Sequence, residues 1–194
     1  MHPTAPDTLY VAVYGSGVYK ISNAKATTPT STNIRTHTSQ GRIALALSAS
    51  KPSVLYAQFA STAGEPLAID HSGNGGASGS WISGTIPPHD PQLSSFMNTQ
   101  GWYDNTIAVN PADELTVYVA GVDSYQSADA GTTWTKMTSW QSLSAPYVHA
   151  DIHDIRFASG STFYIACDGG VYGTSSSGGS WSALSSGLSV TLFY

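Results

Sequence analysis

Charged side chains are scarce in this sequence of 194 residues, where 7 Lys and Arg stand against 12 Asp and Glu. The few cations are scattered and form no basic stripe. Because nucleic-acid binding needs clustered Lys and Arg to neutralise phosphates, we expect no nucleic-acid partner. Solubility must rest on Ser, Thr, Asn, Gly and Tyr instead, a balance that is common in extracellular all-β proteins.

Cysteine and long apolar runs are also nearly absent. The single Cys167 lies in the apolar run 163–167, so an internal disulfide is excluded and a buried small hydrophobe is the simplest interpretation. No apolar run approaches the roughly 20 residues of a membrane helix, so we expect no membrane insertion. Residues 1–7 lack the cationic and apolar parts of a signal peptide, and we expect any export signal to have stood upstream or to have been removed.

Helical periodicity is missing as well, because Gly and Pro interrupt the chain before a helix could be stabilised. What the sequence has instead is a repeat of short alternating apolar segments, each followed by a strand centred on tyrosine. The four anchors are Tyr10, Tyr56, Tyr118 and Tyr164, with gaps of 46, 62 and 46 residues. A period in this range with short strands is typical of β-propellers. We therefore predict an all-β fold of about four blades, each a four-stranded antiparallel sheet.

The predicted blades cover roughly residues 7–40, 41–100, 101–148 and 149–190 of a single propeller segment, 1–194. The third anchor comes late because of an insertion at about 84–103, and long loops on a rigid scaffold often carry function. Residues 191–194 have the pattern of a further inner strand. We expect this segment to be part of a larger propeller, since four blades are at the small end of the range; the alternative is that this strand closes onto the first blade. An open edge would favour self-association.

The turn Ser127-Ala-Asp129-Ala-Gly131-Thr-Thr133-Trp134 is the most specific local motif. At this spacing the Asp carboxylate can accept hydrogen bonds from backbone N–H groups, Gly can supply a positive φ, and the Trp ring can fold over the blade. We interpret it as a structural device. Two weaker copies are in phase with it: residues 174–181, with Ser176 at the Asp position and Gly178 and Trp181 retained, and a stretched copy at 70–81.

This motif resembles the Asp-box of BNR-repeat propellers, and the resemblance covers the chain from about residue 10 to 194. Segments 101–104, 147–154, 168–172 and 186–194 look like pieces of large secreted bacterial BNR proteins that are often labelled glycosyl-hydrolase-like. Their repeat design is similar to that of xyloglucanases and the sortilin propeller. The resemblance implies a secreted or cell-surface protein with more than four blades that acts on or binds carbohydrate.

The segment His149-x-Asp151-x-His153 is the first candidate site. In an extended chain these three side chains would share one face and form a partial shell for a divalent metal such as zinc. Two other interpretations stay open: a substrate-binding or acid–base role for the histidines, and a hydrogen-bonded structural element of the channel. Apart from this metal, no cofactor is expected.

The loop Gly101-Trp102-Tyr103-Asp104 is the second candidate site. Sugars stack their C–H faces on aromatic rings while polar groups fix their hydroxyls, so Trp102, Tyr103 and Asp104 could contact a glycan; alternatively, both rings fill space between blades. A glycoside hydrolase would need two carboxyl groups across the channel, and the candidates are Asp104, Asp151 and Asp154. A non-catalytic adhesion, glycan-binding or surface-assembly module is the alternative function, because repeat surfaces suit binding.

Overall fold

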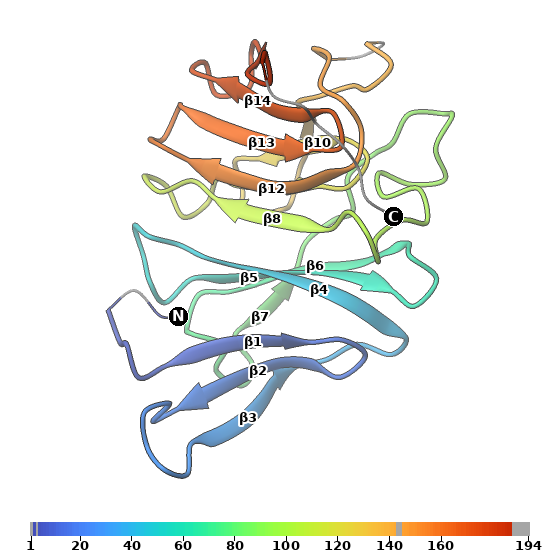
Figure 1. Ribbon diagram of the computed structural model, residues 1–194. Coiled ribbons are helices and arrows are strands. Elements are labelled where there is room, and N and C mark those ends of the chain that lie inside the picture. Colours follow the sequence, from blue (N-terminus) through green and yellow to red (C-terminus); the bar gives the residue numbers. More distant parts are fainter. Residues whose placement is uncertain (1, 3, 143–144, 188–194) are drawn as a thin grey trace.

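The computed structural model describes residue 2, residues 4–142 and residues 145–187, and the strand predicted at 191–194 lies outside these ranges. All regular structure in the described residues is β, so the all-β prediction is confirmed. The strands form four antiparallel sheets, each built from consecutive strands (Figure 1). Blade A contains β1 (Leu9–Val13), β2 (Gly17–Ser22) and β3 (Thr30–Arg35); blade B contains β4 (Gln40–Leu47), β5 (Leu55–Ser61), β6 (Pro66–Ser72) and β7 (Trp81–Ser83); blade C contains β8 (Thr106–Val109), β9 (Val117–Ala120), β10 (Ser124–Ser127) and β11 (Thr135–Lys136); blade D contains β12 (Ile152–Phe157), β13 (Phe163–Cys167), β14 (Gly170–Thr174) and β15 (Ser182–Ala183).

The blades are stacked face to face, and each pair of neighbours shares a hydrophobic core. Alternation within a strand explains this arrangement, because successive side chains point to opposite faces of a sheet. In β5, Tyr56 and Ala60 pack in the core shared with blade C, whereas Ala57 and Phe59 pack in the core shared with blade A. A third core joins blades C and D and includes Tyr118 and Phe163.

The inner strands β4, β8 and β12 lie side by side, with β8 packed against both of the others (Figure 1). Segments 44–47, 106–109 and 154–157 of these strands line a cavity of about 400 Å³. This cavity runs along the innermost edges of three neighbouring blades, where a propeller has its central channel.

Three of the four tyrosine anchors occupy equivalent strands. Tyr56, Tyr118 and Tyr164 lie in the second strand of their blades, whereas Tyr10 lies in β1, the first strand of blade A. Blade A therefore has three strands and lacks, among the described residues, the counterpart of β4, β8 and β12. The prediction of four-stranded blades is confirmed in blades B, C and D, and blade A has three strands among the described residues.

Three turns at the ends of the third strands of blades B, C and D have the same backbone shape. In blade C, Asp129 Oδ1 accepts hydrogen bonds from the Thr132 N–H at 3.1 Å and the Thr133 N–H at 2.8 Å, and Ser127 Oγ accepts one from the Gly131 N–H at 2.8 Å. Hydrogen bonds from the backbone and hydroxyl of Thr133 lower the pKa of Asp129 to about 2. The Trp134 indole N–H donates to the Thr85 carbonyl at 2.9 Å, which ties this turn to blade B.

The other two turns keep the shape with weaker side chains. In blade D, Ser176 Oγ accepts a hydrogen bond from the Ser180 N–H at 3.0 Å, and Gly178 has a φ of 90°, close to the 92° of Gly131. Trp181 packs against the core between blades C and D. In blade B, the Gly76 N–H donates to Ser72 Oγ at 2.9 Å. A hydroxyl thus replaces the carboxylate in blade D.

The insertion at 84–103 is anchored between blades B and C. Phe96 and Met97 are fully buried in the core that these blades share. Lys136 forms ion pairs with Asp90 of the insertion and with Asp123, the latter at 2.8 Å. These contacts fix the course of the chain into the loop at 101–105.

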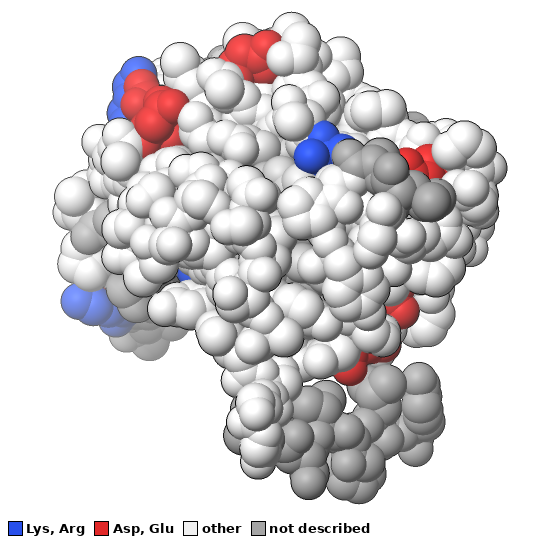
Figure 2. Space-filling model, turned by 90° about the horizontal axis from the view of Figure 1, so that it is seen from above, with Lys and Arg blue, Asp and Glu red and all other residues white. Residues whose placement is uncertain are grey.

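The surface carries few charges, and Figure 2 shows small separate acidic and basic groups on a largely uncharged face. None of the described residues forms a helix long and apolar enough to cross a membrane.

Candidate functional site

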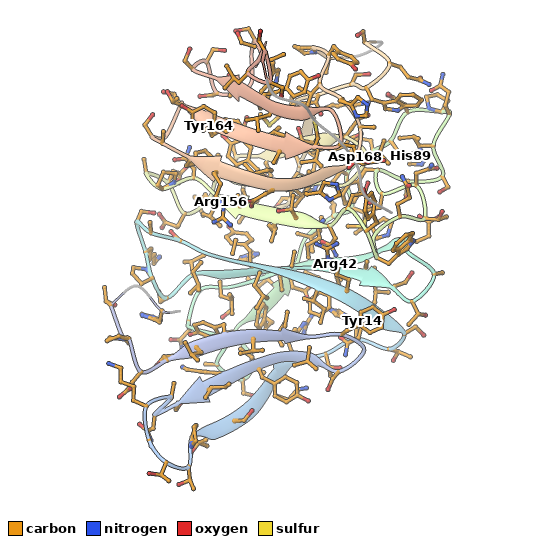
Figure 3. The ribbon with its side chains drawn as sticks, viewed as in Figure 1. Tyr14, Arg42, His89, Arg156, Tyr164 and Asp168 are labelled. Atoms are coloured by element: carbon orange, nitrogen blue, oxygen red, sulfur yellow. The ribbon has the colours of Figure 1, made fainter. Side chains whose placement is uncertain are left out.

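Three loops from blades C and D meet at one end of the inner strands. They are the 101–105 loop before β8, residues 149–151 before β12, and the turn between β13 and β14. Arg42, near the start of β4, and Asp168, in the β13–β14 turn, lie on this side of the molecule, whereas Arg156 and Tyr164 lie on the opposite side (Figure 3). We call the group formed by Trp102, Tyr103, Asp104, Asp151, His153 and Asp168 the rim site.

Asp104 is the most perturbed acid of the rim site. It has no exposed surface, and neither carboxyl oxygen has a hydrogen-bond partner in the described structure. Burial, and then the negative charge of Asp151, raises its pKa to about 8. An unpaired buried carboxylate is costly, so Asp104 is a neutral acid at pH 7.

Asp151 lies beside Asp104 and is partly exposed. Burial, followed by the charge of Asp168, raises its pKa, while a hydrogen bond from Gln100 Nε2 to Asp151 Oδ1 at 3.2 Å opposes the shift. Interaction with Asp104 also favours the ionised form of Asp151. The two acids therefore differ in environment, with Asp104 holding a proton behind the more accessible Asp151.

Tyr103, His153 and Asp168 form a hydrogen-bonded group next to this pair. The Tyr103 hydroxyl donates to Asp168 Oδ1 at 3.0 Å, and His153 Nε2 lies 2.6 Å from the same oxygen. The Tyr103 and His153 rings meet edge to face with centroids 4.7 Å apart. These contacts fix the tyrosine ring and the imidazole in one orientation.

Trp102 provides the most exposed aromatic surface of the rim site, with 63% of the residue accessible. Its ring centroid is 5.5 Å from that of Tyr103. The Arg42 guanidinium donates to the backbone carbonyls of Trp102 and Tyr103, and the Asn105 amide donates to the Arg42 carbonyl at 3.1 Å. Blade B thus holds the backbone of the loop in place while the indole ring faces solvent.

The alternating arrangement predicted for His149, Asp151 and His153 is not formed. The strand begins only at Ile152, and Asp151 has a φ of 62°, which breaks the extended geometry on which the prediction rested. His149 Nδ1 instead lies 3.1 Å from the Ala150 carbonyl. Across the described ranges, no three His, Cys, Asp or Glu side chains converge as a metal site would require.

Asp154 is separate from the acid pair. Its carboxylate accepts a hydrogen bond from Arg156 Nε at 2.7 Å, and both side chains are substantially exposed. Asp154 lines the cavity between the inner strands, and we found no contact that joins it to Asp104 or Asp151. Of the three carboxylates predicted as catalytic candidates, Asp104 and Asp151 thus form a coupled pair, whereas Asp154 lies at the cavity between the inner strands.

The sequence analysis did not identify Asp168, Gln100 or Arg42. Asp168 lies in the turn between β13 and β14, and the pairing of Ile152 with Cys167 places it across the hairpin from the 151–153 segment. Gly169 gives a second signal, because a Cβ there would lie 2.4 Å from the Cβ of His149. No periodic pattern marks Gln100 or Arg42, whose roles depend on loops from different blades.

Comparison with known proteins supports the propeller fold. No family model and no curated protein matches the chain. Among solved structures, it is similar to a GH74 enzyme from Niastella koreensis, with a TM-score of 0.67, 18% identity, and coverage of 94% of this chain and 28% of that one. It is similar to the GH74 xyloglucanase from Xanthomonas campestris, with a TM-score of 0.65, 18% identity, and coverage of 95% and 29%. YCF48 from Cyanidioschyzon merolae matches with a TM-score of 0.52, 11% identity, and coverage of 94% and 53%. The chain thus spans less than a third of the GH74 proteins, and it has a propeller fold shared with both kinds of protein.

Proposed function

We propose that this chain binds carbohydrate at the rim site, as part of a secreted or cell-surface propeller. The observation that carries the proposal is the exposed Trp102 ring held beside Tyr103 and the acids of neighbouring blades. A sugar presents apolar C–H faces that stack on aromatic rings, while its hydroxyls need hydrogen-bond partners nearby. The rim site offers both kinds of surface within one group of loops.

The fold gives further support. Two of its structural neighbours are described as GH74 enzymes, and one of these as a xyloglucanase, so the same scaffold is used by proteins that act on a β-glucan. Fold similarity at this identity does not transfer a substrate. It makes plant-type β-glucan oligosaccharides the first glycans to test.

Trp102→Ala tests the proposal. Stacking on an aromatic ring is worth about 0.5–1.5 kcal/mol, so we expect this change to weaken binding of cello-oligosaccharides and xyloglucan oligosaccharides by up to about tenfold in calorimetry. Tyr164→Ala is the matched control, because Tyr164 is also an exposed aromatic residue but lies on the opposite side (Figure 3). Equal affinities for wild type and Trp102→Ala would contradict the proposal.

A second candidate function is glycoside hydrolysis, and the acid pair favours it. A buried Asp104 with a pKa of about 8 next to the partly exposed Asp151 resembles the unequal pair of carboxyls that acid–base chemistry uses. Because Asp104 is fully buried, Asp151 is the member that would contact a substrate and Asp104 would act through it. Asp151→Asn should then abolish release of reducing sugar but retain oligosaccharide binding. Wild-type protein that binds glycans without turnover would leave the non-catalytic binding function.

A further inference from the structure

A small pocket adjoins Asp151, with a volume of about 240 Å³. Its apolar wall comes from Leu93 of the insertion, Val122 of the β9–β10 loop and Trp140. Leu93 and Val122 are buried, whereas Trp140 is 37% exposed and also lines the pocket. The pocket is smaller than the roughly 300–1,000 Å³ of sites for drug-sized ligands, so its size suits one sugar ring.

The polar wall of the pocket has unused hydrogen-bonding capacity. Gln100 Nε2 donates to Asp151 Oδ1, and we found no hydrogen bond from a described residue to Gln100 Oε1. Asn98 Oδ1 accepts a hydrogen bond from the Ser94 N–H at 3.3 Å, and Asn98 Nδ2 has no partner in the described part of the chain. The lining of the pocket therefore includes an amide donor, an amide acceptor and an aromatic residue, which is the combination that a sugar ring needs.

The backbone around this polar wall is held in an unusual conformation. Asn98 and Thr99 have φ values of 46° and 63°, and left-handed geometry is a genuine outlier for a β-branched residue such as Thr. The fit against blade B enforces it, because a Cβ at Gly64 would lie only 1.9 Å from the Thr99 carbonyl oxygen. Strained backbone of this kind persists where surrounding structure over-determines it, and it clusters at ligand sites.

The charged residues around the pocket further restrict the class of sugar that it could bind. Asp151 is the one charged residue among the described residues that line the pocket, and the Asp168 charge also acts on Asp151. Neither Arg42 nor Lys136 lines the pocket, since Arg42 holds the 101–105 loop and Lys136 is paired with Asp123. A uronic acid or another anionic sugar would be repelled here, whereas a neutral sugar would not.

We infer that this pocket is a binding subsite for one neutral sugar ring of a glycan chain that crosses Asp151 from Trp102, with Trp140 as its stacking platform. This inference rests on the proposed function and adds the position, size and charge of a second contact. It also gives the insertion a role, because Leu93, Asn98 and Gln100 all come from it.

The test is the chain-length dependence of affinity, measured by calorimetry with cellobiose through cellohexaose on wild type, Trp140→Ala, Trp140→Phe and Tyr164→Ala. In wild type, affinity should rise when the oligosaccharide becomes long enough to fill the pocket. Trp140→Ala should remove that rise, with a loss of about tenfold for the longest oligosaccharide and little change for cellobiose. Trp140→Phe should retain most of the rise, and the Tyr164 control should match wild type.

Three results separate the possible failures. A normal rise with chain length in Trp140→Ala would overturn the subsite and leave the proposed function intact. Equal binding of galacturonic-acid oligomers and neutral oligomers by wild type would overturn the assignment of a neutral sugar. No binding of any oligosaccharide by folded wild type would overturn the proposed function and the subsite together.

Discussion

Asp104→Asn should change the pH dependence of folding stability. The ordinary pKa of this side chain is 3.8, and the folded protein raises it to about 8. Between these values the folded state binds a proton that the unfolded state has released. Stability therefore falls as pH rises through this window, by about 1.36 kcal/mol per pH unit for a fully separated group. Asn has nearly the same shape as Asp but carries no titrating proton, so Asp104→Asn removes this pH dependence.

From pH 5 to pH 7 the free energy of unfolding of wild type should fall by up to about 2.7 kcal/mol relative to Asp104→Asn. This figure is an upper value because Asp104 and Asp151 titrate as a coupled pair. The measurement is urea unfolding of both proteins at several pH values between 5 and 8. Taking the difference between the two proteins cancels the titration of histidines that they share.

Asp154→Asn is the control, since Asp154 is exposed and paired with Arg156. Its free energy of unfolding should run nearly parallel to that of wild type across the same pH range. If the Asp104→Asn curve is also parallel to wild type, Asp104 is ionised in the folded protein and the reasoning about the acid pair is refuted.

Three further predictions concern the turns and the contact between Gly64 and the insertion. Ser176→Asp should stabilise blade D by about 0.5–1.5 kcal/mol in thermal unfolding, because a carboxylate would replace a hydroxyl as the acceptor of the turn. The stabilisation by Asp129, whose folded pKa is about 2, should be full above pH 4 and disappear as pH falls through 2, so Asp129→Asn should differ from wild type at pH 6 but little at pH 2. Gly64→Ala should cost about 3 kcal/mol or more, because φ is 84° and the added Cβ meets Thr99, whereas Gly73→Ala, with nothing within 4 Å, should be tolerated; equal melting temperatures would contradict this.

The fold could be predicted because its signal is local and repeated. Tyr56 and Tyr118 occupy equivalent strands since the same alternation of side chains recurs in each repeat. The pattern around Tyr10 looks the same as the others, so it could not reveal that blade A has three strands among the described residues. An inner strand is recognised only by what lies next to it in space.

The site was predicted in part. Trp102, Tyr103, Asp104 and Asp151 stand out in the sequence because aromatic and acidic residues are concentrated in short loops, and the structure brings them together. The extended geometry expected for His149, Asp151 and His153 is broken at one backbone angle, the positive φ of Asp151, which an Asp side chain tolerates but which no sequence pattern signals. Gln100 could not be found because its contact with Asp151 depends on how the insertion folds back.

The rim site draws its residues from the loops of blades C and D, Arg42 of blade B holds the 101–105 loop, and blade A and Tyr164 lie outside it. Under the proposed function, recognition would therefore depend on the three adjoining sheets of blades B, C and D and not on the circumference as a whole. A propeller with this design could gain or lose blades elsewhere during evolution and keep its ligand, because stacking one more sheet leaves the geometry of these three unchanged.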